Sequence, residues 1–218
     1  MKKKVPRAKR RIPTTLLKSM KRVLIIRARK HSSRLHDKHL LNIDGVPLIS
    51  KVIEHAIQSK SDAVLLSTNC DRIANVASEF KGAVTCIKRP DALCIEPPGR
   101  DIATNIDDFH WKMWKKLSGS NEPIMSARLF GNSLIFDDSL TDREMDELER
   151  YPEDTVISGV LASSESHPYM SLIEQGNGKY SRFVDMDIPI RTNDWPDIVM
   201  RSNGPVCYTL PDDSLPGN

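Results

Sequence analysis

Short apolar runs alternate with segments of helical periodicity through the first two thirds of the chain. The apolar runs are expected to be strands, and they are Val23–Ile26, Ala63–Ser67, Ala83–Ile87, Pro123–Leu129 and Thr155–Leu161. The helix-periodic segments are residues 47–59, 71–80, 101–117 and 139–150. In the first of these helices, an apolar stripe is expected to contain Leu48, Val52, Ile53 and Ile57. The alternation predicts an α/β fold with a mostly parallel sheet and helices on both faces.

Two polar segments depart from this alternation. Residues 27–46 are predicted to form a polar loop, and residues 162–200 are predicted to be a flap insertion of irregular strands and loops within a domain spanning 23–218. Ligands of open α/β sheets lie beyond the carboxyl ends of the strands. The segments that follow strands are therefore candidate binding loops, and they are residues 27–38, 67–71, 87–101 and 130–133.

The charge is unevenly distributed along the chain. Residues 1–22 carry ten lysines and arginines and no acid, while the other 196 residues carry 22 basic and 29 acidic side chains, a net charge of −7. We interpret residues 1–22 as a basic, disordered tail. The alternative is that this tail directs the protein to nucleic acid or to the nucleus.

Other features of the composition restrict the class of protein. No run of about 18 apolar residues occurs, so no membrane-spanning helix is expected. The four cysteines have no CxxC spacing, which favours reduced, inert thiols in a cytoplasmic compartment. Trp111 and Trp114, three residues apart on a predicted helix, are interpreted as core or interface residues rather than a stacking platform.

The stretch VLIIRARKHSSRLHDK, residues 23–38, joins a predicted strand to a strongly basic loop. Its cations are Arg27, Arg29, Lys30, Arg34 and Lys38. Cations and backbone N–H groups at a strand end suit an anionic ligand such as a nucleoside triphosphate. The stretch lacks the glycine patterns GxxxxGK[ST] and GxGxxG. From chemistry alone, a solvated basic loop remains the alternative.

The same stretch, followed by IDGVPLI, resembles the signature of the sugar-activating cytidylyltransferases. These are the acylneuraminate (CMP-sialic acid) synthetases and the 3-deoxy-manno-octulosonate cytidylyltransferases. The matching residues are Ala28, Arg29, Ser32, Leu35, Lys38, Gly45, Pro47, Leu48 and Ile49. Later segments also resemble family motifs in order and spacing, and they are LSTN at 66–69, DRIA at 71–74, KRPDAL at 88–93, HPY at 167–169, and Arg191 with Asn203-Gly204.

The resemblance implies a Rossmann-like nucleotide-diphospho-sugar transferase fold and a definite reaction. CMP would pass from CTP to the anomeric hydroxyl of an acidic 2-keto sugar of the sialic or octulosonate type, with release of pyrophosphate. It further implies Mg²⁺ as cofactor and a homodimer joined through residues 162–200.

The resemblance also assigns residues to roles. Arg29 and Lys38 would grip the triphosphate as catalytic residues. The implied nucleotide-binding residues are Ala28, Arg29, Ser32, Ser33, Arg34, Lys38, Thr68, Asn69, Arg89 and Asn132. The implied sugar-binding residues are Tyr169, Arg191 and Asn203.

Several positions depart from the family pattern. Arg27 stands where the family usually has proline, Thr192 where it has glutamine, Asn69 where it has aspartate, and Asn132 where some relatives have a metal-binding aspartate. The family's C-terminal Asp-x-Asp element is not found before Asn218. These departures leave the metal ligands unknown, and they support a second hypothesis: a catalytically inactive nucleotide-binding or regulatory homologue on the same fold. An enzyme that uses another nucleotide or sugar is a third.

Two local acidic pairs are candidate metal ligands. Asp185 and Asp187 form an Asp-x-Asp sequence inside the predicted flap, and Asp212-Asp213 lies near the end of the chain. Both pairs are interpreted as solvated charge rather than as magnesium ligands.

Overall fold

The computed structural model describes residues 20–30, 35–94, 102–135, 137, 139–163, 165–184 and 195–211, with residues 102–105 and 203 described by their backbone alone. The chain divides into two compact units. The first contains Met1–Ile157 and Gly204–Asn218, and the second contains Ser158–Asn203.

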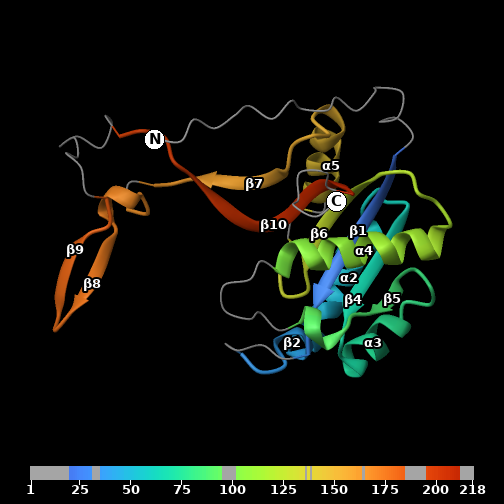
Figure 1. Ribbon diagram of the computed structural model, residues 1–218. Helices are drawn as coiled ribbons and strands as arrows, with labels where there is room; N and C mark the ends of the chain where they lie inside the picture. The colour runs from blue at the N-terminus through green and yellow to red at the C-terminus, as the bar shows by residue number, and fades with distance from the viewer. Residues whose placement is uncertain are drawn as a thin grey trace. The chain divides into compact units, whose positions relative to one another are not determined.

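The first unit is built on a mostly parallel sheet (Figure 1). Its strands are β1 (Lys21–Ala28), β4 (Ala63–Thr68), β5 (Thr85–Lys88), β6 (Ile124–Phe130) and β10 (Val199–Leu210), of which the last continues from the second unit. The strand order is β5-β4-β1-β6-β10. The central strand β1 runs parallel to β4 and β6, β4 runs parallel to β5, and β10 is antiparallel to β6.

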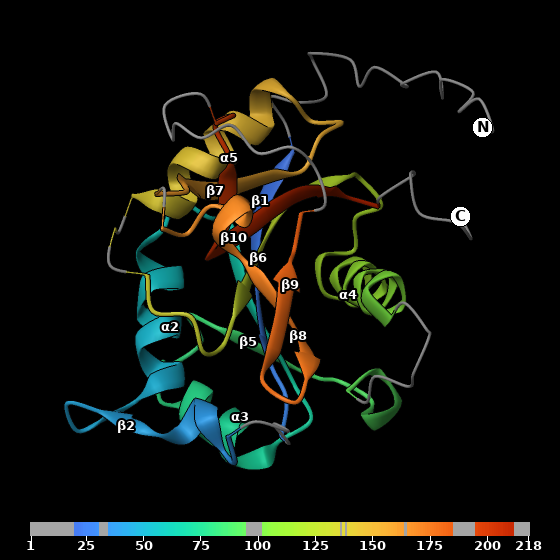
Figure 2. The same cartoon turned by 90° about the vertical axis from the view of Figure 1, so that its left-hand side faces the viewer.

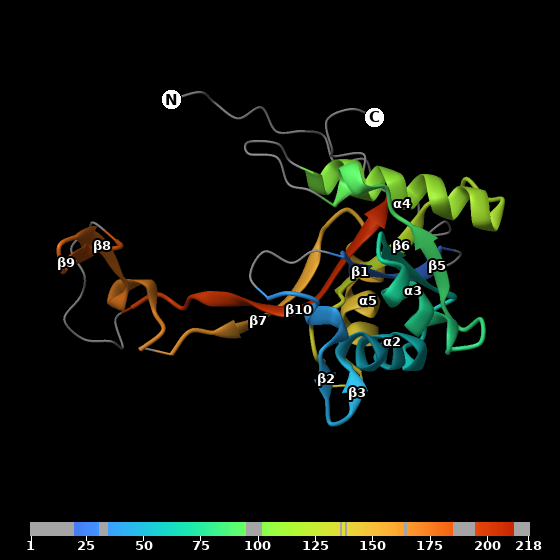
Figure 3. The same ribbon diagram turned by 90° about the horizontal axis from the view of Figure 1, so that it is seen from below.

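Helices cover both faces of this sheet, as predicted. The helices are α2 (Leu48–Gln58), α3 (Asp71–Ser78), α4 (Ile102–Ser118) and α5 (Leu140–Arg150). Figures 2 and 3 show α4 on one side of the sheet, and α2 and α3 on the other. Because side chains alternate along a strand, Leu24 and Ile26 pack in the core formed with α2, α3 and α5, while Ile25 packs with Trp111 and Trp114 of α4. The predicted core role of the two tryptophans is thereby confirmed.

The predicted helices and strands are present, with small differences at their ends. In α2, the buried stripe includes Ile49, Val52, Ile53 and Ala56, whereas Ile57, which we expected in the stripe, is 37% exposed. The helical period brings the neighbouring Ala56 to the core-facing side instead.

The prediction of an unbroken loop over residues 27–46 was wrong. β1 extends to Ala28, and the segment then contains the 3₁₀ helix η1 (Lys38–Leu40) and a small hairpin of β2 (Asn42–Ile43) and β3 (Val46–Pro47). The hairpin turns at Asp44-Gly45, where both residues have positive φ (54° and 81°). Asp-Gly is the residue pair that such a turn prefers, so the signal was present in the sequence.

The predicted end of the basic tail at residue 22 was also wrong, because β1 begins at Lys21. The Lys21 ammonium lies 2.6 Å from Asp62, and the Arg22 guanidinium lies 2.7 Å from Asp146 and 2.8 Å from Glu149. These ion pairs attach the start of the strand to the domain. Residues 1–19 lie outside the described residues, so the role of the tail stays a prediction. Among the described helices, none combines the length and the apolar composition that a membrane span needs.

The second unit contains paired strands and a hairpin. β7 (Val156–Leu161), which begins in the first unit, pairs with β10, and the Ser158 and Ser202 hydroxyls are 2.6 Å apart. The hairpin of this unit joins β8 (Leu172–Gly176) to β9 (Lys179–Arg182), and η3 (Pro168–Met170) precedes it. The long strand β10 was not predicted, because Asn203-Gly204-Pro205 interrupts its apolar pattern.

Candidate functional site

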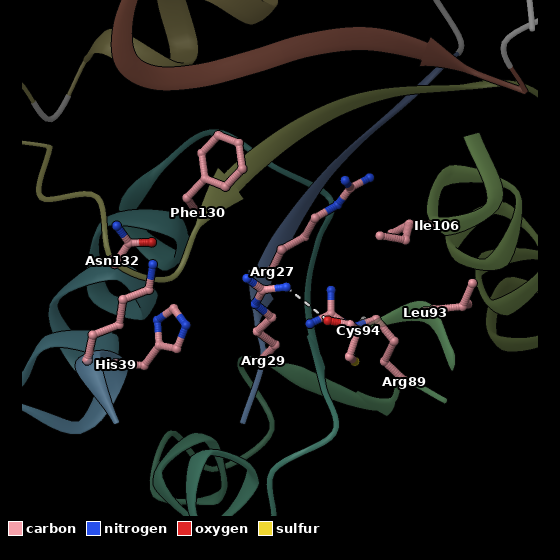
Figure 4. Close-up of a pocket in the computed structure, with 10 residues that line it drawn as sticks. Arg27, Arg29, His39, Arg89, Leu93, Cys94, Ile106, Phe130 and Asn132 are labelled. Atoms are coloured by element: carbon pink, nitrogen blue, oxygen red, sulfur yellow. Dashed lines mark hydrogen bonds between the residues drawn. The ribbon is translucent and has the colours of Figure 1, made fainter. Parts of the chain in front are cut away.

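A cavity of about 250 Å³ lies in the first unit at the carboxyl ends of the parallel strands (Figure 4). Five chain segments contribute to it: the end of β1, the helix η1, the loop after β5, helix α4 and the end of β6. The lining residues are Arg27, Arg29, Lys38, His39, Arg89, Leu93, Cys94, Ile106, Phe130 and Asn132. The position agrees with the expectation that ligands of an open α/β sheet lie beyond its strand ends.

Arg27 is placed in this cavity by the alternation of side chains along β1. It follows Val23 and Ile25 on the face that α4 covers. There its guanidinium forms an ion pair with Asp107, and the Arg27 side chain is only 10% exposed. Burial lowers the pKa of Arg27, and Asp107 partly offsets that effect. An arginine keeps its charge in spite of such shifts, so a cation is fixed at the inner wall of the cavity.

Asp107 is the centre of a buried polar cluster. Its carboxylate accepts a 2.7 Å hydrogen bond from the Tyr208 hydroxyl and lies 3.8 Å from the Arg128 guanidinium. His110 stands one helical turn further along α4, with its Nδ1 atom 3.9 Å from the carboxylate. The spacing of Asp107, His110, Trp111 and Trp114 puts all four on the sheet-facing side of α4.

The protonation states of this cluster follow from burial and charge. Burial alone would raise the pKa of Asp107, but His110, Arg27 and Tyr208 together hold that pKa below its ordinary value. Burial lowers the pKa of His110 from 6.5 to about 4, and burial raises the pKa of Tyr208. At neutral pH the cluster therefore contains one anion and two cations, Arg27 and Arg128, with a neutral imidazole and a neutral phenol.

Arg29 and Arg89 bind neutral acceptors on the loop after β5. The Arg29 Nη1 atom donates to the Cys94 carbonyl at 2.9 Å, as the dashed line in Figure 4 marks, and the Arg89 Nε atom donates to the Cys94 sulfur at 3.1 Å. The Arg89 backbone N–H donates to the Thr68 carbonyl at 2.8 Å. Among the described residues, no carboxylate lies within 4.0 Å of either guanidinium. Within the described part of the chain, the side-chain hydrogen bonds of both guanidiniums therefore go to the neutral acceptors of Cys94.

The helix η1 brings Lys38 and His39 to the opposite wall. It follows Asp37, which has a left-handed backbone (φ 48°). His39 is buried, and burial lowers its pKa although a hydrogen bond with the backbone of Gly131 opposes the shift. The ring is therefore neutral at pH 7, and Lys38 is the cation of this wall.

Asn132 is positioned by the close approach of Gly131 to β1. The Gly131 N–H donates to the Arg27 carbonyl at 2.9 Å. A Cβ atom at Gly131 would lie 2.9 Å from both the Ala28 Cβ and the Ile49 Cδ1 atoms. Only glycine permits this contact without displacement, and the exposed Asn132 is thereby held at the cavity.

The structure thus brings four of the predicted nucleotide-binding residues around one cavity: Arg29, Lys38, Arg89 and Asn132. Three others lie nearby without lining it. The Ala28 side chain is buried in the core, and the Thr68 hydroxyl accepts from the Cys70 N–H at 3.1 Å. The Asn69 side chain joins Lys30 to Asp91, with both hydrogen bonds at 2.8 Å.

Further predicted residues lie elsewhere or outside the described part of the chain. Ser32, Ser33, Arg34 and Arg191 lie outside it, as do Asp185, Asp187, Asp212 and Asp213, and Asn203 is described by its backbone alone. Tyr169 belongs to the second unit, where its ring packs against His167 and Trp195 with centroids 4.5 and 5.4 Å away. The predicted sugar-binding roles of Tyr169, Arg191 and Asn203 therefore stay predictions.

Three residues of the site were given no role from the sequence, and they are Arg27, His39 and Asp107. Arg27 was noted as one cation of the basic stretch and as a departure from the family but was given no role, although its place in the alternation of β1 indicates an inward-facing side chain. Asp107 precedes Trp111 and Trp114 by four and seven residues, which is the spacing of one helix face. That spacing was the available signal for a buried carboxylate.

The described residues of the cavity do not fit a magnesium site. Mg²⁺ prefers carboxylate oxygens, and Asn132 contributes at most a neutral amide oxygen. The nearby carboxylate, Asp107, is already bound by Arg27 and Tyr208. Within the described ranges, no group of three or more His, Cys, Asp and Glu side chains is arranged to hold a metal ion.

Part of the sequence that contributes to this cavity is similar to known proteins. Residues 23–92 match the family model for cytidylyltransferases. The 3-deoxy-manno-octulosonate cytidylyltransferase of Coxiella burnetii is 44% identical over 68 residues, which are 31% of this chain and 27% of that protein. The enzyme of the same name from Chlorobium phaeobacteroides is 34% identical over 108 residues, 49% of this chain and 42% of that protein. The chain therefore spans less than half the length of these two relatives.

Solved structures show the same fold. The CMP:2-keto-3-deoxy-manno-octonic acid synthetase complexed with CTP aligns with a TM-score of 0.57 at 18% identity, over 86% of this chain and 73% of that one. A 4-diphosphocytidyl-2C-methyl-D-erythritol synthase aligns with a TM-score of 0.56 at 13% identity, over 84% and 74%. The predicted Rossmann-like nucleotidyltransferase fold is confirmed. Residues 23–92, which carry Arg29, Lys38 and Arg89, thus match the model of the cytidylyltransferase family that their motifs resemble.

Proposed function

We propose that the protein is a nucleotidyltransferase that moves CMP from CTP to the anomeric hydroxyl of an acidic 2-keto sugar. The observation that carries the proposal is the convergence of Arg29, Lys38 and Arg89 on one cavity, because all three lie in the segment that matches the family. The octulosonate cytidylyltransferases among its relatives favour a sugar of the octulosonate type. Sialic acid is the second sugar of the same chemical class.

The reaction requires positioning and charge neutralisation more than covalent chemistry. The sugar hydroxyl attacks the α-phosphorus of CTP, a new P–O bond forms, and the bond from the α-phosphorus to the bridging oxygen breaks. Pyrophosphate leaves with the electron pair, and the hydroxyl proton is released. Fixed cations that face the phosphates lower the barrier because they stabilise charge that grows in the transition state.

Parts of this work are assigned, within the proposal, to particular side chains of the cavity. Arg29 and Arg89, which are anchored on Cys94, would hold the phosphates from one side, and Lys38 would hold them from η1. A planar guanidinium binds two phosphate oxygens at once, whereas the ammonium of Lys38 acts as a point charge. The family implies Mg²⁺, but the described residues do not supply its ligands, so no step is assigned to it.

Pyrophosphate release tests this proposal. Purified chain is supplied with CTP and Mg²⁺, and in parallel with 3-deoxy-manno-octulosonate, N-acetylneuraminate or no sugar. We expect release with one sugar only, and a loss of about 100-fold in kcat/KM for Arg29→Met, the size seen when one charge-stabilising donor is removed. Arg150→Met is the matched control, because Arg150 is exposed on α5 and does not line the cavity.

A second function is favoured by Asn132, a neutral residue that lines the cavity where the resemblance leads us to expect, from some relatives, a metal-binding aspartate. In that case the protein would bind CTP without turning it over, as a regulatory homologue. Two results together would support this function and reject the transferase. CTP would raise the melting temperature of the wild-type chain but not of Arg29→Met, and neither sugar would give pyrophosphate.

The homodimer expected from the family is kept as part of the proposal. Apolar side chains of the second unit are more than half exposed, and they are Val160, Leu161, Met170, Leu172, Tyr180, Phe183 and Val199. Exposed apolar surface of this kind is typical of a protein interface. Light scattering after gel filtration should give twice the mass of the chain, and a monomeric mass would remove this part of the proposal.

A further inference from the structure

Three of the candidate binding loops are joined by the side chain of one residue, Asn69. The Lys30 backbone N–H, in the loop after β1, donates to the Asn69 Oδ1 atom at 2.8 Å. The Asn69 Nδ2 atom donates at 2.8 Å to the carboxylate of Asp91, which begins the 3₁₀ helix η2 (Asp91–Leu93) after β5. Asn69 itself directly follows β4. Its amide therefore links the carboxyl ends of three neighbouring parallel strands.

The two partners of Asn69 determine which way its amide points. A backbone N–H can only donate, so it requires the amide oxygen, and a carboxylate can only accept, so it requires the NH₂ group. Asparagine satisfies both partners at once. Aspartate at this position could still accept from Lys30, but it would place a second negative charge at hydrogen-bond distance from Asp91, and like charges repel. Position 69 therefore suits an amide and not a carboxylate.

The contacts of Asn69 belong to a closed ring of hydrogen bonds that includes Arg29. From Asp91 the ring continues through its carbonyl, which accepts from the Cys94 N–H at 2.8 Å. The Cys94 carbonyl accepts in turn from the Arg29 Nη1 atom at 2.9 Å. Arg29 is bonded to Lys30, whose N–H leads back to Asn69. Four hydrogen bonds through two other loops thus hold the Arg29 guanidinium relative to its own backbone.

The ring also carries an acceptor for Arg89. The Arg89 Nε atom donates to the Cys94 sulfur at 3.1 Å, and Arg89 is 4% exposed. A buried guanidinium depends on protein acceptors for its orientation, because little water reaches it. Arg29 and Arg89, which both line the cavity, therefore share Cys94 as their anchor, and Figure 4 shows both side chains at this residue.

We propose that Asn69 is a positioning residue for binding of the nucleoside triphosphate, because its amide closes the ring that orients Arg29 and Arg89. Donors that are oriented before the ligand arrives are the most effective, since they need no reorganisation when they meet its charge. Asn69 does not line the cavity, so it acts through its partners and not by contact with the ligand. The inference rests on the proposed function, and it adds the residue that prepares two of its cations.

Exchange of the two polar groups between positions 69 and 91 tests the inference in the full chain. Asn69→Asp keeps the acceptor for Lys30 but opposes two carboxylates, so its Kd for CTP, measured by calorimetry, should rise about tenfold. The swap variant, Asn69→Asp with Asp91→Asn, again has one carboxylate and one amide. Both hydrogen bonds can form in the swap variant, so it should restore the affinity of the wild type.

The matched control is Asn69→Asp with Asp71→Asn, which has the same net charge as the swap variant. Asp71 is exposed at the start of α3 and does not line the cavity, so this pair leaves the opposed carboxylates in place and should stay weak. Equal affinities of the control and the swap variant would show that net charge alone acts, and would overturn the inference. So would an unchanged Kd for Asn69→Asp, and both results leave the proposed function intact.

Hydrogen exchange at the Cys94 amide of the ligand-free chain gives a readout that does not depend on CTP. Exchange should be faster in Asn69→Asp than in the wild type and the swap variant, because the ring that holds this amide is broken. Equal exchange rates in all three would overturn the inference. A folded wild-type chain that binds no CTP would instead reject the proposed function, and the positioning role with it.

Discussion

Replacement of Asp107 by asparagine should destabilise the protein strongly, although the two side chains have nearly the same shape. The amide oxygen of asparagine can still accept the hydrogen bond from Tyr208, which is 2.7 Å long in the wild type. What is lost is the single negative charge between Arg27 and Arg128, whose side chains are 10% and 16% exposed. Two buried cations would then remain without an anion.

The magnitude follows from the cost of a buried, uncompensated charge. Removal of one partner of a buried ion pair costs about 3–5 kcal/mol in the free energy of unfolding. The neighbouring residue on the same helix provides the contrast. Asp108 pairs with Lys112 at 2.6 Å, but the two side chains are 43% and 67% exposed. Asp108→Asn should therefore cost at most about 1 kcal/mol.

Urea denaturation followed by circular dichroism measures both variants, and a double-mutant cycle isolates the ion pair. Arg27→Met alone should be destabilising. Arg27→Met combined with Asp107→Asn should be less destabilised than the sum of the single variants, because the double variant has lost both members of the pair. Equal stability losses for Asp107→Asn and Asp108→Asn, or strict additivity in the cycle, would refute the assignment of Asp107 as the buried counter-ion.

Three further predictions follow from the described contacts. The pKa of His110 falls from 6.5 to about 4 on folding, so as the pH drops the unfolded chain binds a proton before the folded chain does. The free energy of unfolding should therefore fall by roughly 3 kcal/mol between pH 6.5 and pH 4. His110→Gln should flatten the dependence of this free energy on pH, measured by urea denaturation, over the same range. Gly131→Ala should displace the loop that carries Asn132 and weaken CTP binding about tenfold by calorimetry, while unchanged affinity would contradict the argued close approach to Ala28. Ile53→Ala should lower the free energy of unfolding, measured by urea denaturation, by about 2–5 kcal/mol because Ile53 is fully buried. Ile57→Ala is its control, because Ile57 is 37% exposed. Similar losses for both variants would contradict the orientation of α2.

Much of the fold could be predicted from the sequence because its signals are local. The apolar runs at Val23–Ile26 and Ala63–Ser67 and the helical period of residues 47–59 each specify one element. Short runs separated by helices leave few topologies other than a parallel sheet. The hairpin at Asp44-Gly45 was missed because residues 27–46 were interpreted as one polar loop.

The candidate site was predicted in part. Arg29 and Lys38 follow a strand within a family motif, so both chemistry and resemblance pointed to them. Asp107 could not be distinguished from the adjacent Asp108 by residue type alone. The fold shows that Asp107 is buried against Arg27 of β1 and Arg128 of β6, whereas Asp108 pairs with Lys112 at the surface. A buried charge becomes recognisable once its partner on another element is known.

The most direct test of the account is to identify the product of the reaction by ³¹P NMR. The purified chain is incubated with CTP and 3-deoxy-manno-octulosonate or N-acetylneuraminate, and Arg29→Met and Arg150→Met are run beside it. The account predicts a new phosphodiester signal of the CMP-sugar and an equal amount of pyrophosphate for the wild type and Arg150→Met, and about 100-fold slower growth of both signals for Arg29→Met. Unchanged CTP with both sugars, or CMP and pyrophosphate formed without any sugar, would contradict it.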